Sequence, residues 1–265
     1  MFGNIQPVTK NLLLLNIAMA LLTAFFDSQG TIDLGSLLGA HYFNTPLFEP
    51  YQLVSHFFMH QSILDPNGGF LHIFMNMYVL VVFGSFLERL WGPKRFFMLY
   101  VASALGAYLL YSGIGAFQVM ELKRLIGDEH IISGMNSILK EYGRSEECIA
   151  ALNRFLSDQN INDVQTAAIH SYLNKSFVPM VGASGAIFGL MAAFAILFPN
   201  TQLMLIFPPI PIKAKWLIGG YFLFEVYYSF QKNQGDHVAH LAHVGGAIVG
   251  AIIVLIWRRT GKNFY

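Results

Sequence analysis

Three groups of polar residues in an otherwise apolar chain have side chains suited to acyl-transfer chemistry. Ser184 lies in the run Gly-Ala-Ser-Gly at the beginning of an apolar segment. His243 lies in a second apolar segment, and in a third Asn76 follows His72 by four residues, on the same helical face. A serine hydroxyl is a weak nucleophile until a base such as imidazole takes its proton. A carboxamide can donate a hydrogen bond to the oxyanion that then forms. The set therefore holds a nucleophile, a base and an oxyanion donor.

The composition indicates the environment of these residues. Of the 265 residues, 12% are charged and 55% are apolar, and phenylalanine occurs 24 times. An average soluble domain has about 25% charged residues, and a soluble fold of this size cannot bury so much apolar surface. The net charge of +1 without a basic block excludes disorder and nucleic-acid binding. Cys148 is the only cysteine, which excludes a disulfide scaffold. The chain is predicted to be a polytopic membrane protein in contact with the lipid bilayer.

Six segments have the ~20 mostly apolar residues that a spanning helix needs. The first run has only Lys10 before it and no small-residue cleavage pattern after it, so we expect a first span rather than a signal peptide. The fifth is the weakest, because it contains Glu225. The predicted fold class is all-α, a bundle of six transmembrane helices at 11–28, 71–88, 96–117, 177–198, 215–231 and 237–257.

Lysine and arginine in the short loops predict the orientation, because they are enriched on the cytoplasmic side. The short loops of one side contain only Lys232, so we expect both termini on the other, cytoplasmic, side. A short N-terminus without a transit segment favours a bacterial cytoplasmic membrane. The basic residues of the cytoplasmic side are Lys10, Arg89, Lys94, Arg95, Lys213, Lys215, Arg258, Arg259 and Lys262.

Three stretches are not expected to span. Residues 29–70 form a long outer loop. Residues 199–214, with four prolines and Lys213, are predicted to be an interfacial stretch on the cytoplasmic side. Residues 118–176 hold 14 of the 31 charged residues, and Ser145 before two glutamates is typical of a helix start. We therefore expect three parts: a core of three spans over 1–117, a polar helical insertion outside the membrane over 118–176, and three further spans with a short tail over 177–265.

The even-numbered spans all enter the membrane from the outer side in this topology. At 1.5 Å rise per residue, Ser184 lies roughly 10 Å below the start of its span, His243 roughly 9 Å and Asn76 roughly 8 Å. The three side chains are thus expected in one layer. Gly185 with Gly189, and Gly246 with Gly250, form small-residue faces that let helix backbones approach closely. Such an approach would bring the serine within reach of the histidine.

These residues resemble the rhomboid family of intramembrane serine proteases. Three motifs match, in the family's order and on the corresponding spans, and the resemblance covers the six-span core without the insertion. They are His72-x-x-x-Asn76, Gly182-Ala183-Ser184-Gly185, and Ala242-His243-Val244-Gly245-Gly246 followed by Gly250.

The resemblance implies a Ser184–His243 dyad with no third acid. Asn76, His72 and the Ser184 backbone N–H would form the oxyanion hole. Phe188 stands where the family often has a tyrosine that stacks on the catalytic histidine, so only the packing role carries over. The implied substrates are membrane-anchored proteins, cut in or near a transmembrane segment and often at small residues. No metal, nucleotide or other cofactor is implied.

The chain departs from the family pattern in two places. The family often has a Trp-Arg pair in the first outer loop, where this chain has Pro50-Tyr51-Gln52. The insertion 118–176 is absent from the minimal pattern. Our hypothesis is that it hangs beside the opening of the active site and restricts or recruits substrates.

The remaining histidines have the side chains of metal ligands. His56 and His60 have the spacing of zinc helices, but Phe57 stands where a metalloprotease needs glutamate. His237, His240 and His243 fan over roughly 120° of a helix. We therefore expect hydrogen-bonding roles for His56, His60 and His240.

Two rival functions remain, a non-catalytic relative that binds transmembrane helices and a transporter that relays protons or metals through its histidines. A transporter would be expected to have more ionisable groups at mid-depth than Glu225. For Glu225 itself, a buried hydrogen-bonding role and a gating role both stay open.

Overall fold

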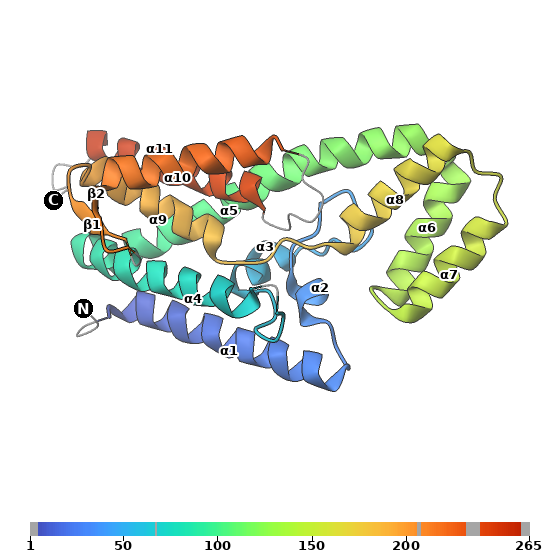
Figure 1. The fold of residues 1–265 in the computed structure, drawn as a ribbon, viewed down its shortest axis with the longest axis horizontal. Helices are drawn as coiled ribbons and strands as arrows, with labels where there is room; N and C mark the ends of the chain where they lie inside the picture. The colour runs from blue at the N-terminus through green and yellow to red at the C-terminus, as the bar shows by residue number, and fades with distance from the viewer. Residues whose placement is uncertain (1–4, 67, 206–207, 232–238, 261–265) are drawn as a thin grey trace.

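The computed structural model describes residues 5–66, 68–205, 208–231 and 239–260. Lys232, His237 and Lys262 lie outside this range. Figure 1 shows a helical bundle, formed by α1, α4, α5, α9, α10 and α11, from which a smaller group, α6 to α8, projects at one end.

The bundle helices follow most of the predicted spans. They are α1 (Pro7–Gln29), α4 (Gly69–Val79), α5 (Ser85–Ile126), α9 (Ser184–Leu197), α10 (Ala214–Ser229) and α11 (His240–Thr260), with a π-helical turn, η2 (Leu80–Gly84), joining α4 to α5. Within α5 the chain reverses at Gly92, whose φ of 78° favours glycine, and Pro93 begins the next arm. The turn separates the predicted second and third spans.

Among the described residues, three helical segments are long and apolar enough to cross a membrane: α1, the stretch Gly69–Ile126 that the turn divides, and α11. The apolar α9 has 14 residues and α10 has 16, so both are shorter than the spans predicted there. Large apolar side chains are exposed along the outside of the bundle, as expected of a surface that faces lipid. They include Leu14, Leu21 and Phe25 of α1, Leu223 and Tyr227 of α10, and Ile252 and Ile256 of α11.

The prediction that a span begins at residue 177 was wrong. Phe177 ends α8, and α9 begins only at Ser184. Pro179 and Gly182, with a φ of 123°, hold the intervening chain in an irregular conformation. An apolar stretch of this kind satisfies the composition of a span without being helical. Ser184 is therefore the first residue of its helix rather than the eighth.

The arm of α5 after the turn extends beyond the predicted span 96–117 to Ile126. At 1.5 Å per residue it is roughly 50 Å long, and in Figure 1 it runs the length of the molecule to α6–α8. The helices that it carries are α6 (Glu129–Tyr142), α7 (Glu146–Ser157) and α8 (Asp163–Phe177). As predicted, Ser145 caps α7, its side chain accepting a hydrogen bond from the Cys148 N–H.

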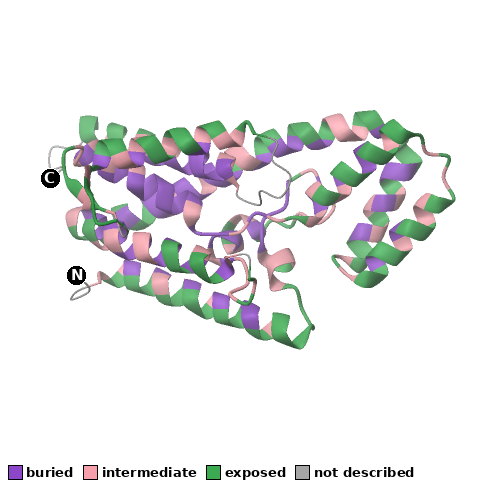
Figure 2. Ribbon diagram, viewed as in Figure 1, coloured by how far each residue is buried: buried purple, intermediate pink, exposed green. Residues whose placement is uncertain are grey.

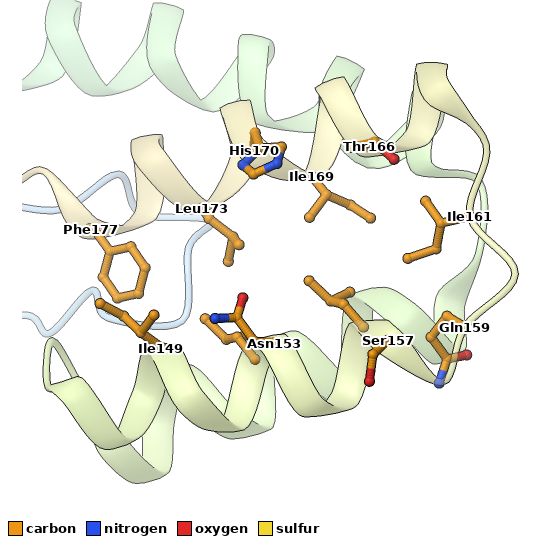
Figure 3. Close-up of a pocket in the computed structure, with 12 residues that line it drawn as sticks. Ile149, Asn153, Ser157, Gln159, Ile161, Thr166, Ile169, His170, Leu173 and Phe177 are labelled. Carbon is orange, nitrogen blue, oxygen red and sulfur yellow. The ribbon is translucent and has the colours of Figure 1, made fainter.

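These outer helices have an apolar core of their own, which includes Ile131, Met135, Leu139, Leu152 and Tyr172. A groove of about 590 Å³ lies between α7 and α8 and contains none of the predicted site residues (Figure 3). It is lined by Ile149, Leu152, Asn153, Leu156, Ser157, Gln159, Ile161, Thr166, Ile169, His170, Leu173 and Phe177.

The remaining elements are short. The outer loop contains α2 (Leu34–Leu38), α3 (Gln52–Ser55) and the 3-10 turn η1 (His56–Phe58). Gln52 stands where the chain departs from the family pattern. Its side chain is buried and hydrogen-bonds to several parts of the loop. Its amide accepts from the N–H of His41 and donates to the carbonyls of Leu37 and Leu47. The stretch predicted as interfacial contains two antiparallel strands, β1 (Gln202–Met204) and β2 (Pro211–Lys213).

The centre of the bundle is α9, whose residues are buried nearly all round (Figure 2). Its closest neighbour is α11, because glycines remove the side chains between them. A Cβ at Gly246 would collide with the carbonyl oxygen of Gly185, and a Cβ at Gly250 would lie 2.5 Å from the Gly189 Cα. The two predicted small-residue faces therefore meet, and Gly185 and Gly189 also contact Ala107 and Ser103 of α5.

Replacing Gly250 by alanine is expected to destabilise the bundle by about 1–3 kcal/mol, because the methyl group has no space beside the α9 backbone. The measurement is thermal unfolding in detergent micelles. Gly220→Ala is the matched control, since a Cβ there meets nothing within 4 Å and alanine is the better helix former. If Gly250→Ala were as stable as Gly220→Ala, the close packing of α9 and α11 would be refuted.

Candidate active site

Ser184 lies at the N-terminus of a buried helix. As the first residue of α9, it has a backbone N–H that no preceding helical carbonyl can accept. The chain segment just before Ser184 is held by two hydrogen-bonded contacts with the outer loop. Met180 and Ala40 exchange two backbone hydrogen bonds of 2.8 Å, and the Gly182 N–H donates to the His56 carbonyl at 3.0 Å. The serine is thus placed by both its helix and the loop.

The structure brings His243 to Ser184. The distance from His243 Nε2 to Ser184 Oγ is 2.8 Å, between residues 59 positions apart. The imidazole is buried in the first turn of α11, and the Phe188 ring stacks on it with 4.4 Å between centroids and 8° between planes. Phe188 therefore packs on His243 as predicted. The stacked ring limits rotation of the imidazole out of its plane.

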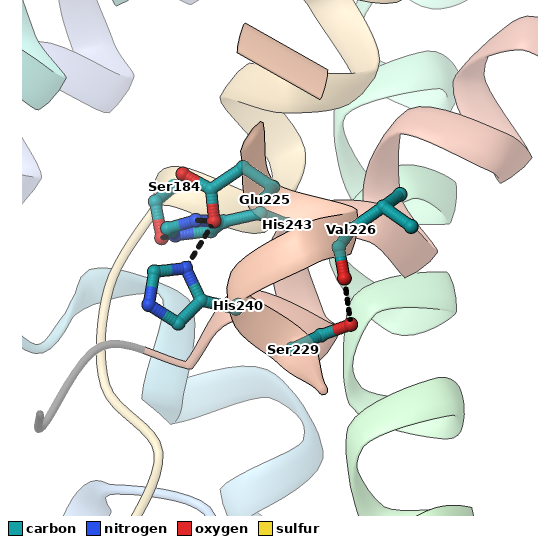
Figure 4. Close-up of polar contacts among 6 residues, drawn as sticks. All are labelled: Ser184, Glu225, Val226, Ser229, His240 and His243. Carbon is teal, nitrogen blue, oxygen red and sulfur yellow. Dashed lines mark hydrogen bonds and ion pairs between the residues drawn. The ribbon is translucent and has the colours of Figure 1, made fainter. Parts of the chain in front are cut away.

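Glu225 approaches the other side of the same imidazole. Its side-chain oxygen Oε2 lies 2.8 Å from His243 Nδ1 and 2.6 Å from His240 Nδ1. Figure 4 shows the carboxylate on α10 between the two rings, with Ser184 beyond His243. Glu225 is 1% exposed, so the two imidazoles stand in for the water that a carboxylate otherwise binds. The sequence singled out Glu225 without indicating this pairing.

The residues predicted for the oxyanion hole lie on α4, which packs against α9. A Cβ on Gly182 would be 3.4 Å from both His72 Nε2 and Ser184 Oγ, so these two side chains line the same side of the loop. Asn76 is buried and donates from Nδ2 to the His72 carbonyl at 2.8 Å. Because a carboxamide has two N–H groups, that bond leaves Asn76 a second donor.

Glu225, His240 and His243 also have the ligand types of a metal site. Their ligand atoms lie within 4.8 Å of one another. The two Glu225–histidine distances match charge-assisted N–H···O hydrogen bonds. With a proton on each Nδ1, both histidines can therefore donate a hydrogen bond to the Glu225 carboxylate. The predicted role of His240 as a hydrogen-bonding residue agrees with its contact to Glu225.

The other two histidines singled out by the sequence belong to the outer loop and lie behind the site. His56 Nδ1 is 2.6 Å from the Gln52 carbonyl, and the His60 ring packs near His72 with 5.4 Å between centroids. Burial lowers the pKa of His56 to about 4, against the opposing hydrogen bond to Gln52. Burial, helped by the nearby His72, lowers the pKa of His60 to about 3. Both imidazoles are therefore neutral at physiological pH.

Comparison with known proteins identifies one family. A family model described as the Rhomboid domain matches residues 47–135 and 130–260, which together cover most of the chain. No curated protein matches the sequence. The matched residues include α4, α9, α10 and α11, and hence each side chain of the site described above.

The buried imidazole of His56 makes the stability of the protein depend on pH. The unfolded chain takes up a proton at this residue near pH 6.5, whereas the folded chain does so only near pH 4. Stability is therefore full above pH 6.5 and falls as the pH is lowered towards 4, by on the order of 3 kcal/mol from this residue. Thermal unfolding in detergent between pH 7 and 4.5 measures the slope.

His56→Gln is expected to reduce that slope. The matched control is His130→Gln, at an exposed position on α6, which should leave the slope unchanged. Equal slopes for wild type and His56→Gln would contradict the assignment.

Proposed function

The chain belongs to the rhomboid family, and we propose that it is a serine endopeptidase that cuts membrane-anchored proteins in or near their transmembrane segments. The observation that carries the proposal is the 2.8 Å contact between Ser184 Oγ and His243 Nε2. A hydroxyl that is hydrogen-bonded to an imidazole at a helix N-terminus can be activated as a nucleophile for acyl transfer, with backbone N–H groups nearby for the oxyanion.

In the proposed reaction the Ser184 Oγ attacks the scissile carbonyl carbon while its proton passes to His243 Nε2. The resulting oxyanion accepts hydrogen bonds from the Ser184 N–H, Asn76 and His72. Collapse of this intermediate breaks the C–N bond, and the leaving amine takes the proton from His243. Water then attacks the acyl-serine with His243 as base, which releases the carboxylate product and restores the hydroxyl. No cofactor enters these steps.

We propose that the bundle crosses the bacterial cytoplasmic membrane six times, with both termini cytoplasmic. Under this proposal the short α9 is surrounded by protein rather than lipid, which agrees with its burial. Its N-terminus then lies below the outer surface, reached by water through the outer loop. Residues 118–176 project outside the membrane beside that opening, where they can select substrates.

The proposed reaction predicts that Ser184→Ala and His243→Ala abolish cleavage of a transmembrane model substrate. Both should also lose labelling by a fluorophosphonate, because each removes a partner of the nucleophile. The assays use purified protein in detergent or liposomes. Ser229→Ala is the matched control, since Ser229 Oγ donates to the Val226 carbonyl of α10 at 2.7 Å (Figure 4).

The same assays separate the rival functions. A non-catalytic relative would bind the substrate without cutting it or labelling. Cleavage that survives Ser184→Ala and stops with a chelator would instead indicate metal chemistry and refute the serine mechanism.

Removing the proposed oxyanion donor is expected to lower kcat rather than raise KM. Asn76→Ala should reduce kcat about 10²- to 10³-fold, the usual effect of losing one such donor. Asn16→Ala is the matched control, because Asn16 is buried in α1 and donates to the carbonyl four residues earlier in the same way. A kcat equal to that of the control would remove Asn76 from the oxyanion hole.

A further inference from the structure

We propose that Glu225 is a positioning residue of the reaction, which holds His243 through Nδ1 and so makes a hydrogen-bonded chain from Glu225 through His243 to Ser184. The inference rests on the proposed function and adds an acid to a dyad that the family resemblance implies without one. Its basis is geometric. The Glu225 Oε2–His243 Nδ1 and His243 Nε2–Ser184 Oγ distances are both 2.8 Å, on opposite nitrogens of one ring.

The contact decides which nitrogen of His243 carries the proton. An ionised carboxylate only accepts hydrogen bonds, so the Nδ1 that faces it must be the N–H of the neutral ring. The lone pair then lies on Nε2, which faces the Ser184 hydroxyl and can take its proton. The opposite tautomer would present an N–H to the serine and could not act as base. Glu225 therefore selects the reactive form of the imidazole.

The same contact acts again once the proton has moved. Protonation of Nε2 makes His243 an imidazolium, and its positive charge is then adjacent to the Glu225 carboxylate. In a buried site the attraction between these charges is much stronger than in water. The interaction is stronger in the transition state than in the resting enzyme, so it raises kcat rather than substrate affinity.

His240 explains how the carboxylate is held in place. Its Nδ1 lies 2.6 Å from the same Oε2, and its ring is nearly perpendicular to that of His243, at 85° and 6.3 Å between centroids. The oxygen therefore receives two donors, three residues apart, from the first turn of α11. A lone carboxylate in an apolar helix is costly, and the hydrogen bond from the second imidazole offsets that cost.

Glu225→Gln tests the proposal, because glutamine keeps the size of the side chain and loses its charge. Its amide can also donate to Nδ1, which favours the unreactive tautomer. We expect kcat for a transmembrane model substrate, and the rate constant of fluorophosphonate labelling, to fall about 10²- to 10⁴-fold with little change in KM. Glu225→Asp, which keeps the charge, should recover part of the loss in both rates.

The matched control is Glu88→Gln. Glu88 is equally buried, 2% exposed, and accepts hydrogen bonds from the backbone of Val8 and Thr9 and from the Thr9 hydroxyl. Its replacement removes a buried carboxylate from another part of the bundle and should leave the labelling rate constant unchanged. The labelled fraction at saturation counts the folded sites in every variant, so loss of folding is measured separately from loss of rate.

Three results would overturn the proposal. The first is that Glu225→Gln has the same kcat and labelling rate constant as wild type. The second is that Glu225→Gln changes KM alone. The third is a smaller labelled fraction with an unchanged rate constant, which assigns Glu225 a purely structural role. In all three cases wild type still cleaves and Ser184→Ala does not, so the proposed protease function stands. If wild type itself neither labels nor cleaves, the protease function fails and this inference with it.

Discussion

The contact between the backbones of α9 and α11 is the constraint on which the rest of the structure depends. Ser184 Oγ and His243 Nε2 lie 2.8 Å apart at one end of this contact. Gly246 and Gly250 meet the backbone of Gly185 and Gly189, so no side chain separates the two helices there. In a membrane, where water does not drive apolar helices together, such packing is a main source of association. The glycines thus serve both the stability of the bundle and the geometry of its site.

Buried charge imposes a second constraint, and the bundle meets it in the same way in two places. Glu88 and Glu225 are both buried among the described residues, and each carboxylate accepts more than one hydrogen bond. The donors around Glu88 come from the start of α1, and they join two helices. The donors around Glu225 are imidazoles, which can themselves gain and lose protons. The surroundings of Glu88 therefore suit a structural role, and those of Glu225 suit a role in proton transfer.

The sequence predicts the groups of the site better than the elements that hold them. Motif spacing and small residues predicted that Ser184 and His243 would meet, and Ser145 was correctly identified as a helix start. The beginning of α9 was missed, because the preceding irregular chain is as apolar as a helix. The partners of Glu225 were also missed. Because α10 is apolar on most sides, its composition does not indicate which face turns inwards. The contacts of Glu225 with His240 and His243 depend on how α10 and α11 pack in the folded protein.

The late start of α9 changes what sets the position of Ser184. The predicted layer of Ser184, His243 and Asn76 rests on counting residues along long spans, yet Ser184 has no helical turn before it. Its position depends instead on the outer loop, which pairs with Met180 through Ala40 and with Gly182 through His56. A serine at the first position of a short, central helix keeps its backbone N–H free of the helical hydrogen bonds, as the proposed oxyanion hole needs. A longer helix would have placed that N–H in the helical ladder, where a preceding carbonyl would accept it.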